Sequence, residues 1–318
     1  MFKAKVDLIK DKNILKALIL FAVPILISNV FQQMYNTMDT MIVGNVLGDV
    51  SLAAIGACGA IYELLIGFAL GIGNGLSIVV ARAYGSKDEN LLKKSVAGSL
   101  IIGCIVTLVI MIISRVFLYP LLEVLNTPAN IIDESYSYIS IITLFVGVMF
   151  AYNLFAGLLR AIGNSVMPLV FLIISSLINV LLDLLFITKF NMGIAGAAVA
   201  TVIAQFISTI LCIVYIIKKC PILIPNKESF NIEKNLYRDL AGQGLSMGLM
   251  ISIVSTGTVI LQTAINELGY LTIAGHVAAR KLNSFCVMPI ATMSLALSTF
   301  VSQNKEQKGM IEYVKVLK

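Results

Sequence analysis

Long apolar segments alternate with short polar segments along almost the whole chain. Read between glycines, prolines and charged residues, this pattern predicts eight membrane-spanning helices. The predicted spans cover residues 14–43, 52–81, 95–119, 133–158, 166–188, 193–217, 240–265 and 271–301. Each is long enough for a hydrocarbon core of about 30 Å. The pattern therefore predicts an all-α polytopic membrane protein.

Composition supports a membrane location and argues against an enzyme. Of 318 residues, 58% are hydrophobic and 13% are charged, and the mean hydropathy is +0.95; soluble domains carry about 25% charged residues. The five cysteines show neither a disulfide framework nor metal-ligand spacing, so we interpret them as small hydrophobic residues. The chain has one His and none of the short hydrolase or nucleotide-binding motifs. We expect no enzymatic activity and no cofactor.

Basic residues concentrate in alternate connections between the predicted spans. They occur in the amino-terminal segment up to Lys16, in the loop 82–94, in the segment 218–239 and in the tail from residue 303, whereas the other connections carry very few. Cytoplasmic loops retain Lys and Arg, so these segments, including both termini, are expected to be cytoplasmic. The net charge of +6 is thus a topology signal, and we expect no nucleic-acid partner.

A weak internal repeat appears when the chain is compared with itself at an offset of 221 residues. Leu47-Gly48 then aligns with Leu268-Gly269, and Ser77 aligns with Ser298. Such symmetry is common in secondary transporters. It predicts a six-helix lobe followed by two helices of a second, related lobe. The predicted division is 1–13 as a cytoplasmic segment, 14–217 as the first lobe, 218–239 as an inter-lobe loop, 240–302 as the start of the second lobe and 303–318 as a cytoplasmic tail.

Two carboxylates lie inside apolar segments, Asp39 in the first predicted span and Asp183 in the fifth. Charged groups within a membrane are expensive and usually functional. Counted from the span ends, Asp39, Asp183 and Thr201 all lie roughly 9–12 Å below the outer face. Asn179 lies one turn deeper than Asp183 on the same helix face. The four residues offer oxygen ligands for Na⁺, or a carboxyl pair that can share a proton. The alternative is hydrogen bonding that only packs the helices.

Other polar residues within the spans are candidates for a substrate pocket. Gln32, Tyr35 and Asn36 spread polar groups over the first span, and Asn153 does so on the fourth. Ordinary interhelical hydrogen bonds are the alternative. Pro24 removes a backbone hydrogen bond and permits a bend in the first helix.

The glycines of the second span permit either kinks or close packing against a neighbouring helix. We assign no role to four further polar residues within the spans, which are Glu63, His276, Arg280 and Lys281.

The chain resembles the multidrug and toxic compound extrusion (MATE) family, particularly its bacterial branch of DNA-damage-inducible exporters. The segments that carry the resemblance are 23–24 (VP), 31–39 (FQQMYNTMD), 43–44 (VG), 47–48 (LG), 53–56 (AAIG), 82–88 (RAYGSKD), 159–164 (LRAIGN) and 193–198 (GIAGAA). The resemblance runs from about residue 15 to Asn304. There the family continues with Gly-Ala and four further helices, whereas this chain continues with Lys305. The chain therefore resembles a transporter truncated after its eighth helix.

The resemblance implies a Na⁺- or H⁺-coupled antiporter in a bacterial cell membrane. Its substrates would be small amphipathic cationic drugs, its surroundings membrane lipids, and Asp39, Asn179, Asp183 and Thr201 match the family's first-lobe cation site. It makes Pro24 a hinge, with a static kink as the alternative. A non-transporting fragment, a self-associating truncated exporter and a lipid-linked oligosaccharide flippase remain open. The flippase would need a strongly cationic cavity.

Overall fold

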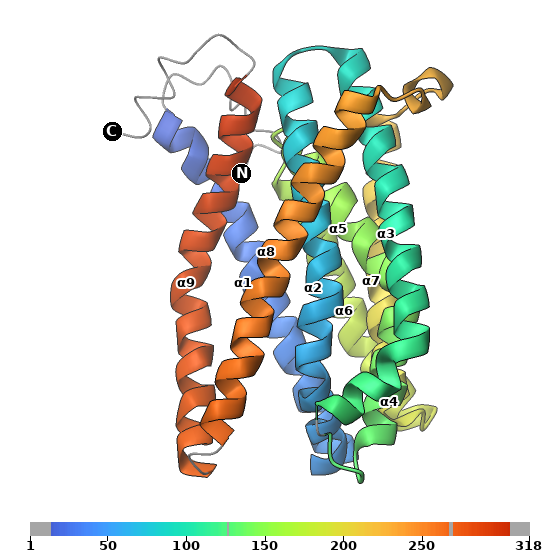
Figure 1. Cartoon of the computed structure of the whole chain (residues 1–318), viewed down its shortest axis with the longest axis vertical. Helices are drawn as coiled ribbons and strands as arrows, with labels where there is room; N and C mark the ends of the chain where they lie inside the picture. Colours follow the sequence, from blue (N-terminus) through green and yellow to red (C-terminus); the bar gives the residue numbers. More distant parts are fainter. Residues whose placement is uncertain (1–13, 126, 267–269, 306–318) are drawn as a thin grey trace.

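The computed structural model describes residues 14–125, 127–266 and 270–305, except for the side chains of 60, 259, 262–266, 270–278, 280–282 and 305. Most residues in these ranges are helical, and no strand occurs among the described residues. The helices are α1 Ile14–Leu47, α2 Asp49–Gly85, α3 Glu89–Val124, α4 Ile132–Leu144, α5 Val146–Ala161, α6 Val166–Leu184, α7 Gly193–Lys219, α8 Lys234–Asn266 and α9 Tyr270–Lys305 (Figure 1). A π-helical turn, η1 Leu185–Lys189, follows α6, and the short 3₁₀ turns η2 Pro221–Leu223 and η3 Lys227–Phe230 connect α7 to α8.

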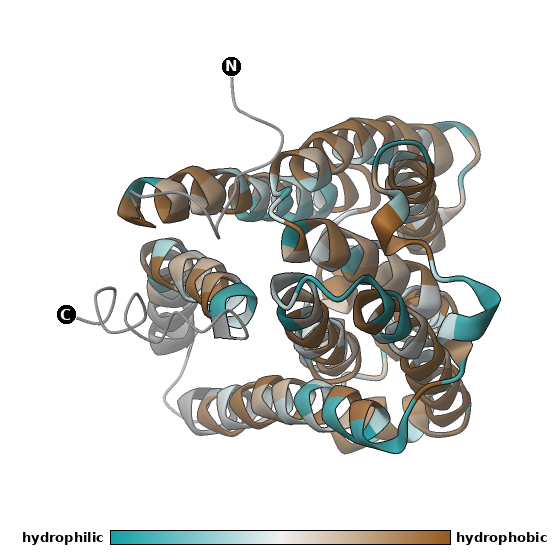
Figure 2. Cartoon of the chain, turned by 90° about the horizontal axis from the view of Figure 1, so that it is seen from above, coloured by the Kyte–Doolittle hydropathy of each residue, from teal (hydrophilic) through white to brown (hydrophobic). Residues whose placement is uncertain are grey.

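Eight membrane crossings fit these helices. Seven described helical segments are individually long and apolar enough to cross a bilayer, and the pair α4 and α5 forms an eighth crossing with a bend of 49°. The prediction of an all-α protein with about eight spans is therefore confirmed. Figure 2 shows hydrophobic residues over the outer faces of the bundle and hydrophilic residues on the connecting segments seen from above. The outer faces match a lipid environment.

The fourth predicted span, 133–158, is not one straight helix. It is interrupted at Phe145, whose backbone (φ −106°, ψ 22°) departs from helical values. The Thr143 hydroxyl donates to the carbonyl oxygens of Ile139 (2.9 Å) and Ser140 (3.2 Å). Hydrogen bonds of this kind compete with the regular helical pattern and bend helices. The bend leaves α4 against α2, α3 and α7, and α5 against α2, α3 and α7 further along the bundle.

The last two helices are longer than the predicted spans. Helix α8 begins at Lys234 rather than at residue 240, and α9 continues to Lys305. Helical residues 234–239 and 303–305 thus extend into the segments predicted as an inter-lobe loop and a cytoplasmic tail. Apolar runs mark only the part of a helix within the hydrocarbon, whereas helical hydrogen bonding continues through charged turns outside it. Gln303 is buried and donates to the carbonyl oxygen of Ala161 at 2.6 Å.

Glycines of α2 allow very close packing against α8. A Cβ atom added to Gly75 would lie 2.3 Å from the carbonyl oxygen of Gln243, and one added to Gly71 would lie 2.8 Å from that of Met247. Nothing lies within 4 Å of a Cβ added to Gly56 or Gly59, nearer the other end of α2. Because α2 is continuous through these positions, the glycines serve close packing rather than kinks. The two helices touch at one end and part toward the other (Figure 1).

The contacts between the first six spans and the last two are reciprocal. Helix α1 packs on α9, and α2 packs on α8. In the alignment at an offset of 221 residues, α1 corresponds to α8 and α2 corresponds to α9, so exchanging the two units would leave this set of contacts unchanged. The arrangement is that of two lobes that meet through equivalent helices.

Basic connections gather at one end of the bundle, which we call the basic end. Arg82, at the end of α2, pairs with Asp239 at the start of α8 (2.8 Å), and Lys94 of α3 pairs with Glu233 (3.2 Å). The loop 82–94 and the segment before α8 are thus neighbours, as the charge pattern predicts for segments on the same side of a membrane.

Candidate functional site

Four polar residues predicted from the sequence lie together between α1, α6 and α7. Helix α1 contributes Asp39, α6 contributes Asn179 and Asp183, and α7 contributes Thr201. Asn179 and Asp183 are fully buried, and Asp39 and Thr201 are each 6% exposed. We call these four residues the carboxylate cluster. The structure thus brings together the four residues that helix counting predicted to lie within one turn of one level.

Asn179 connects the two sides of the carboxylate cluster. In the amide orientation that satisfies both ends of the side chain, its nitrogen donates to Asp183 Oδ2 (3.2 Å) and its oxygen accepts from the backbone N–H of Thr201 (3.3 Å). This orientation is preferred because the hydrogen-bond network decides which end of an amide is nitrogen. Asn179 thereby fixes α6 against α7 beside the carboxylates.

The two carboxyl groups leave polar atoms without partners. Asp39 and Asp183 lie within hydrogen-bonding reach of each other, but Asp39 Oδ1 and Asp183 Oδ1 are buried with no hydrogen bond. Burying a carboxylate oxygen without a partner is costly. A proton shared by the pair, or a small cation bound between them, would remove that cost. Among the described residues, no three His, Cys, Asp or Glu side chains are grouped so that they could hold a metal ion.

Three tyrosines lie next to the carboxylate cluster. The sequence alone did not place them there. The Tyr35 hydroxyl lies close to the Thr201 side chain. Tyr62 of α2 and Tyr138 of α4 lie near enough to Asp39 to interact with its charge. Tyr35 precedes Asp39 by four residues, so the helical period could have placed it on the same face. No comparable sequence signal links Tyr62 or Tyr138 to Asp39.

Asp183 lies at a local irregularity of its helix. The regular part of α6 ends at Leu184, and the π-helical turn η1 begins at the next residue. Asn179 and Asp183 still share one face, because residues four apart in an α-helix lie above one another. Single π turns inside helices are frequent at functional sites, so this irregularity agrees with a functional role for Asp183.

A separate cavity lies between α1 and α9. Its volume is about 410 Å³, and its lining includes Gln32 and Asn36 together with Asn29 and Asn283. None of the described residues that line it is charged. Asn29 also donates to the Thr292 hydroxyl of α9 (3.0 Å), next to the cavity. We call this space the amide cavity. Its amides can donate and accept hydrogen bonds without imposing a charge.

The residues predicted for a substrate pocket are divided between different places. Gln32 and Asn36 line the amide cavity, whereas Tyr35 belongs to the surroundings of the carboxylate cluster. Asn153 does not line the cavity; its side chain donates to the carbonyl oxygen of Met149 in its own helix (2.9 Å). Pro24 is buried within a continuous α1, and its carbonyl oxygen accepts from the Ser28 hydroxyl (2.8 Å).

Glu63 of α2 is exposed and, within the described part of the chain, has neither a hydrogen bond nor an ion pair. It precedes Gly67 by four residues, and a Cβ on Gly67 would lie 3.1 Å from Ile251 of α8. Glu63 therefore lies on the face of α2 that turns toward α8, beyond the point where the helices part. The other three unassigned residues, His276, Arg280 and Lys281, have side chains outside the described set.

Comparisons with known proteins agree on one family. The model of the family MatE matches residues 24–185, about half of the chain. Two Bacillus subtilis (strain 168) proteins, "Probable multidrug resistance protein YoeA" and "Probable multidrug resistance protein YpnP", are 31% and 28% identical to this chain, and each alignment covers 92% of it. The chain spans 65% of the length of these two curated relatives.

Solved structures show the same fold. A structure described as the outward-facing conformation of a multidrug resistance MATE family transporter superposes with a TM-score of 0.87 at 22% identity, over 96% of this chain and 68% of that one. A structure of MATE in the bent conformation gives a TM-score of 0.84 at 22% identity, over 95% and 69% of the two chains.

Proposed function

The chain belongs to the MatE family of membrane transporters, and from this premise we propose that it exports amphipathic cationic compounds in exchange for Na⁺ or H⁺. The observation that carries the proposal is the buried pair of Asp39 and Asp183, each with one unpartnered oxygen. A membrane protein retains such a pair at a cost, and exchange of a proton or a cation at the pair is the use that repays it.

One stretch of α1 connects the carboxylate cluster to the amide cavity. Gln32 and Asn36, four residues apart, face the amide cavity, whereas Tyr35 and Asp39, also four residues apart, face the carboxylate cluster. A rotation or bend of this stretch changes both sites together. In the proposed mechanism, occupancy of the carboxyl pair pulls Asp39 toward α6 and reshapes the amide cavity, and Pro24 gives α1 the freedom to bend.

The described residues near the α2–α8 contact and the amide cavity suit a cationic substrate. Glu63 supplies an exposed carboxylate that has no partner among the described residues where α2 and α8 part, and the amide cavity adds neutral hydrogen-bonding groups. The described residues of its lining include no Lys or Arg, whereas a flippase for anionic lipid-linked sugars would need a cationic cavity; Arg280 and Lys281, next to the cavity on α9, lie outside the described side chains.

In this proposal the protein lies in a bacterial cell membrane with the basic end in the cytoplasm. The carboxylate cluster and the open side of the α2–α8 contact then face outward.

The test is ethidium efflux from bacterial cells that lack their own exporters. The chain is compared with Asp39→Asn, with Asp183→Asn and with an empty vector, and Asp133→Asn, an exposed carboxylate at the start of α4, is the matched control. Efflux by the parent and by the control, lost in the two cluster variants, is the expected result. Because each substitution removes the group that exchanges the ion, the loss should be about tenfold or more.

Equal membrane insertion of all variants, measured by immunoblot, is required for this comparison. Efflux that survives both substitutions would refute coupling at the carboxylate cluster. No efflux from the inserted parent would instead show that this chain is a non-transporting part of a transporter.

A further inference from the structure

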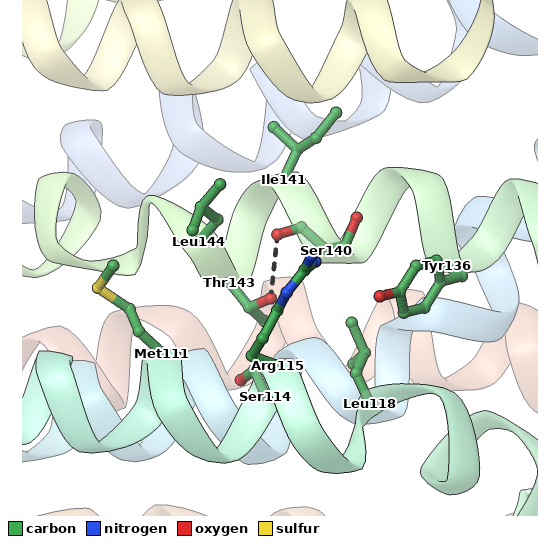
Figure 3. A pocket seen from close by; sticks show the side chains of 9 residues that line it. All are labelled: Met111, Ser114, Arg115, Leu118, Tyr136, Ser140, Ile141, Thr143 and Leu144. Carbon is green, nitrogen blue, oxygen red and sulfur yellow. Dashed lines mark hydrogen bonds between the residues drawn. The ribbon is translucent and has the colours of Figure 1, made fainter.

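A small groove opens between α3 and α4 (Figure 3). Its α3 residues lie toward the end of that helix opposite Lys94 and the basic end. The groove holds about 80 Å³, and the residues on which the argument rests are Met111, Ser114, Arg115, Tyr136, Ser140 and Thr143. We call it the α3–α4 groove. It is separate from both the carboxylate cluster and the amide cavity, and none of the proposed export steps uses it.

Arg115 is a cation without an anionic partner. No carboxylate oxygen lies within 4 Å of its guanidinium in the described part of the chain. Its side chain extends from α3 toward α4, where Ser140 and Thr143 lie (Figure 3). The hydroxyls of those two residues already donate to carbonyl oxygens of their own helix. The N–H groups of Arg115 are therefore available to an external acceptor.

Two further residues that line the groove carry hydroxyls without partners among the described residues. Ser114 is only 3% exposed, and its hydroxyl makes no hydrogen bond in the described part of the chain. Among the described residues, the Tyr136 hydroxyl also makes none. A guanidinium and two hydroxyls in one groove form a donor set suited to the oxygens of a phosphate, which accept several charge-assisted hydrogen bonds at once.

The depth of the groove matches a layer of lipid phosphates. Arg115 follows Lys94 by 21 residues on α3, which corresponds to about 32 Å along the helix and is close to the thickness of a hydrocarbon core. Lys94 lies at the basic end, where it pairs with Glu233. Tyr119 and Tyr136 pack edge to face nearby, with ring centroids 5.5 Å apart, and Tyr is enriched at membrane–water interfaces. Arg115 therefore lies at the phosphate level of the opposite leaflet.

The groove opens onto a lipid-facing surface. Ile112, Ile113, Val116 and Phe117 of α3 are all exposed, and Met111 and Leu144 give the groove apolar walls toward the bilayer centre. A ligand with a phosphate at one end and hydrocarbon chains at the other fits these surroundings, whereas a free anion would leave the apolar walls uncovered.

We propose that the α3–α4 groove binds an anionic phospholipid of the outer leaflet, with its phosphate on Arg115 and its acyl chains along α3. The lipid then bridges α3 and α4 immediately before the bend at Phe145, where no ion pair between described residues joins the two helices.

The test is native mass spectrometry of the purified full chain after incubation with an equal mixture of phosphatidylglycerol and phosphatidylcholine. Arg115→Gln should retain about tenfold less phosphatidylglycerol than the parent, because it loses a charge-assisted contact. Lys189→Gln is the matched control, since it removes an exposed cation that does not line the groove and should leave retention unchanged. Arg115→Lys should restore part of the binding.

Three outcomes would overturn the proposal. These are equal retention by Arg115→Gln and the parent, equal loss in Lys189→Gln, and displacement of the lipid by millimolar inorganic phosphate, which would indicate a site for a soluble anion. If Arg115→Gln fails to fold, Ser114→Ala and Tyr136→Phe carry the test, since each removes one unpartnered hydroxyl and is expected to lower retention severalfold.

Discussion

Asn179 connects the two sides of the carboxylate cluster. Its amide contacts Asp183 on its own helix and the backbone of Thr201 on α7, and the side chain is fully buried. Replacing it with Ala leaves both of these groups unsatisfied in an environment that water does not reach. We expect Asn179→Ala to lower the free energy of unfolding by about 1–3 kcal/mol, measured as a lower Tm in detergent.

Asn153→Ala is the control for this prediction. Asn153 is half-buried and donates only to the carbonyl oxygen of Met149 in its own helix, so its loss breaks no contact between helices. Its Tm should fall less. Equal losses in the two variants would mean that the bridge between α6 and α7 contributes nothing.

Counting residues along the predicted helices was enough to predict that the polar residues of the carboxylate cluster lie near one another. Asp39, Asp183 and Thr201 could be placed at one depth because the helical rise is constant and the span ends were legible. The sequence did not indicate that Tyr35 faces the carboxylate cluster, whereas Gln32 and Asn36 face the amide cavity. Rotation of α1 about its own axis decides which face meets α6 and which meets α9, and the mixed polarity of residues 32–39 leaves that rotation undetermined.

At the scale of elements, the contact between α2 and α8 depends on the absence of side chains. A methyl group on Gly75 would lie 2.3 Å from the carbonyl oxygen of Gln243, so Gly75→Ala must push the helices apart. We expect this overpacking to cost about 1–3 kcal/mol of stability, measured by thermal unfolding. Spin labels on Ser86 and Lys227, near the basic end, should also report a longer distance.

Gly59→Ala provides the comparison within the same helix. Nothing lies within 4 Å of the added methyl group, and Ala favours a helix over Gly by about 1 kcal/mol. This variant should be as stable as the parent or more stable. A Gly75→Ala variant that behaves like Gly59→Ala would show that α2 and α8 adjust without cost.

The differences between the predicted spans and the observed helices have one physical cause. The run 133–158 is apolar throughout, so its hydropathy does not reveal that the chain leaves helical geometry at Phe145. Helix α8 begins among charged residues outside the apolar run. Gln303 satisfies a carbonyl oxygen 142 positions away, at Ala161. Hydropathy records the solvent around a segment, whereas these features are set by local hydrogen bonds and distant partners.

At the scale of the whole molecule, orientation in the membrane is open to a direct test. In a variant without its native cysteines, Ser86→Cys at the basic end and Asn191→Cys at the opposite end are each treated with a membrane-impermeant maleimide. Because basic loops stay in the cytoplasm, Asn191→Cys should react in intact cells and Ser86→Cys only in inverted vesicles. The reverse pattern would place the basic end outside.

The close α2–α8 contact has a consequence for the ionic strength of the medium. Gly71 and Gly75 bring two backbones together by dispersion and close fit, and salt does not screen such contacts. The neighbouring pairs Arg82 with Asp239 and Lys94 with Glu233 are partly exposed, and salt weakens pairs of that kind. The association of α2 with α8 at the basic end should therefore respond only weakly to changes in salt concentration.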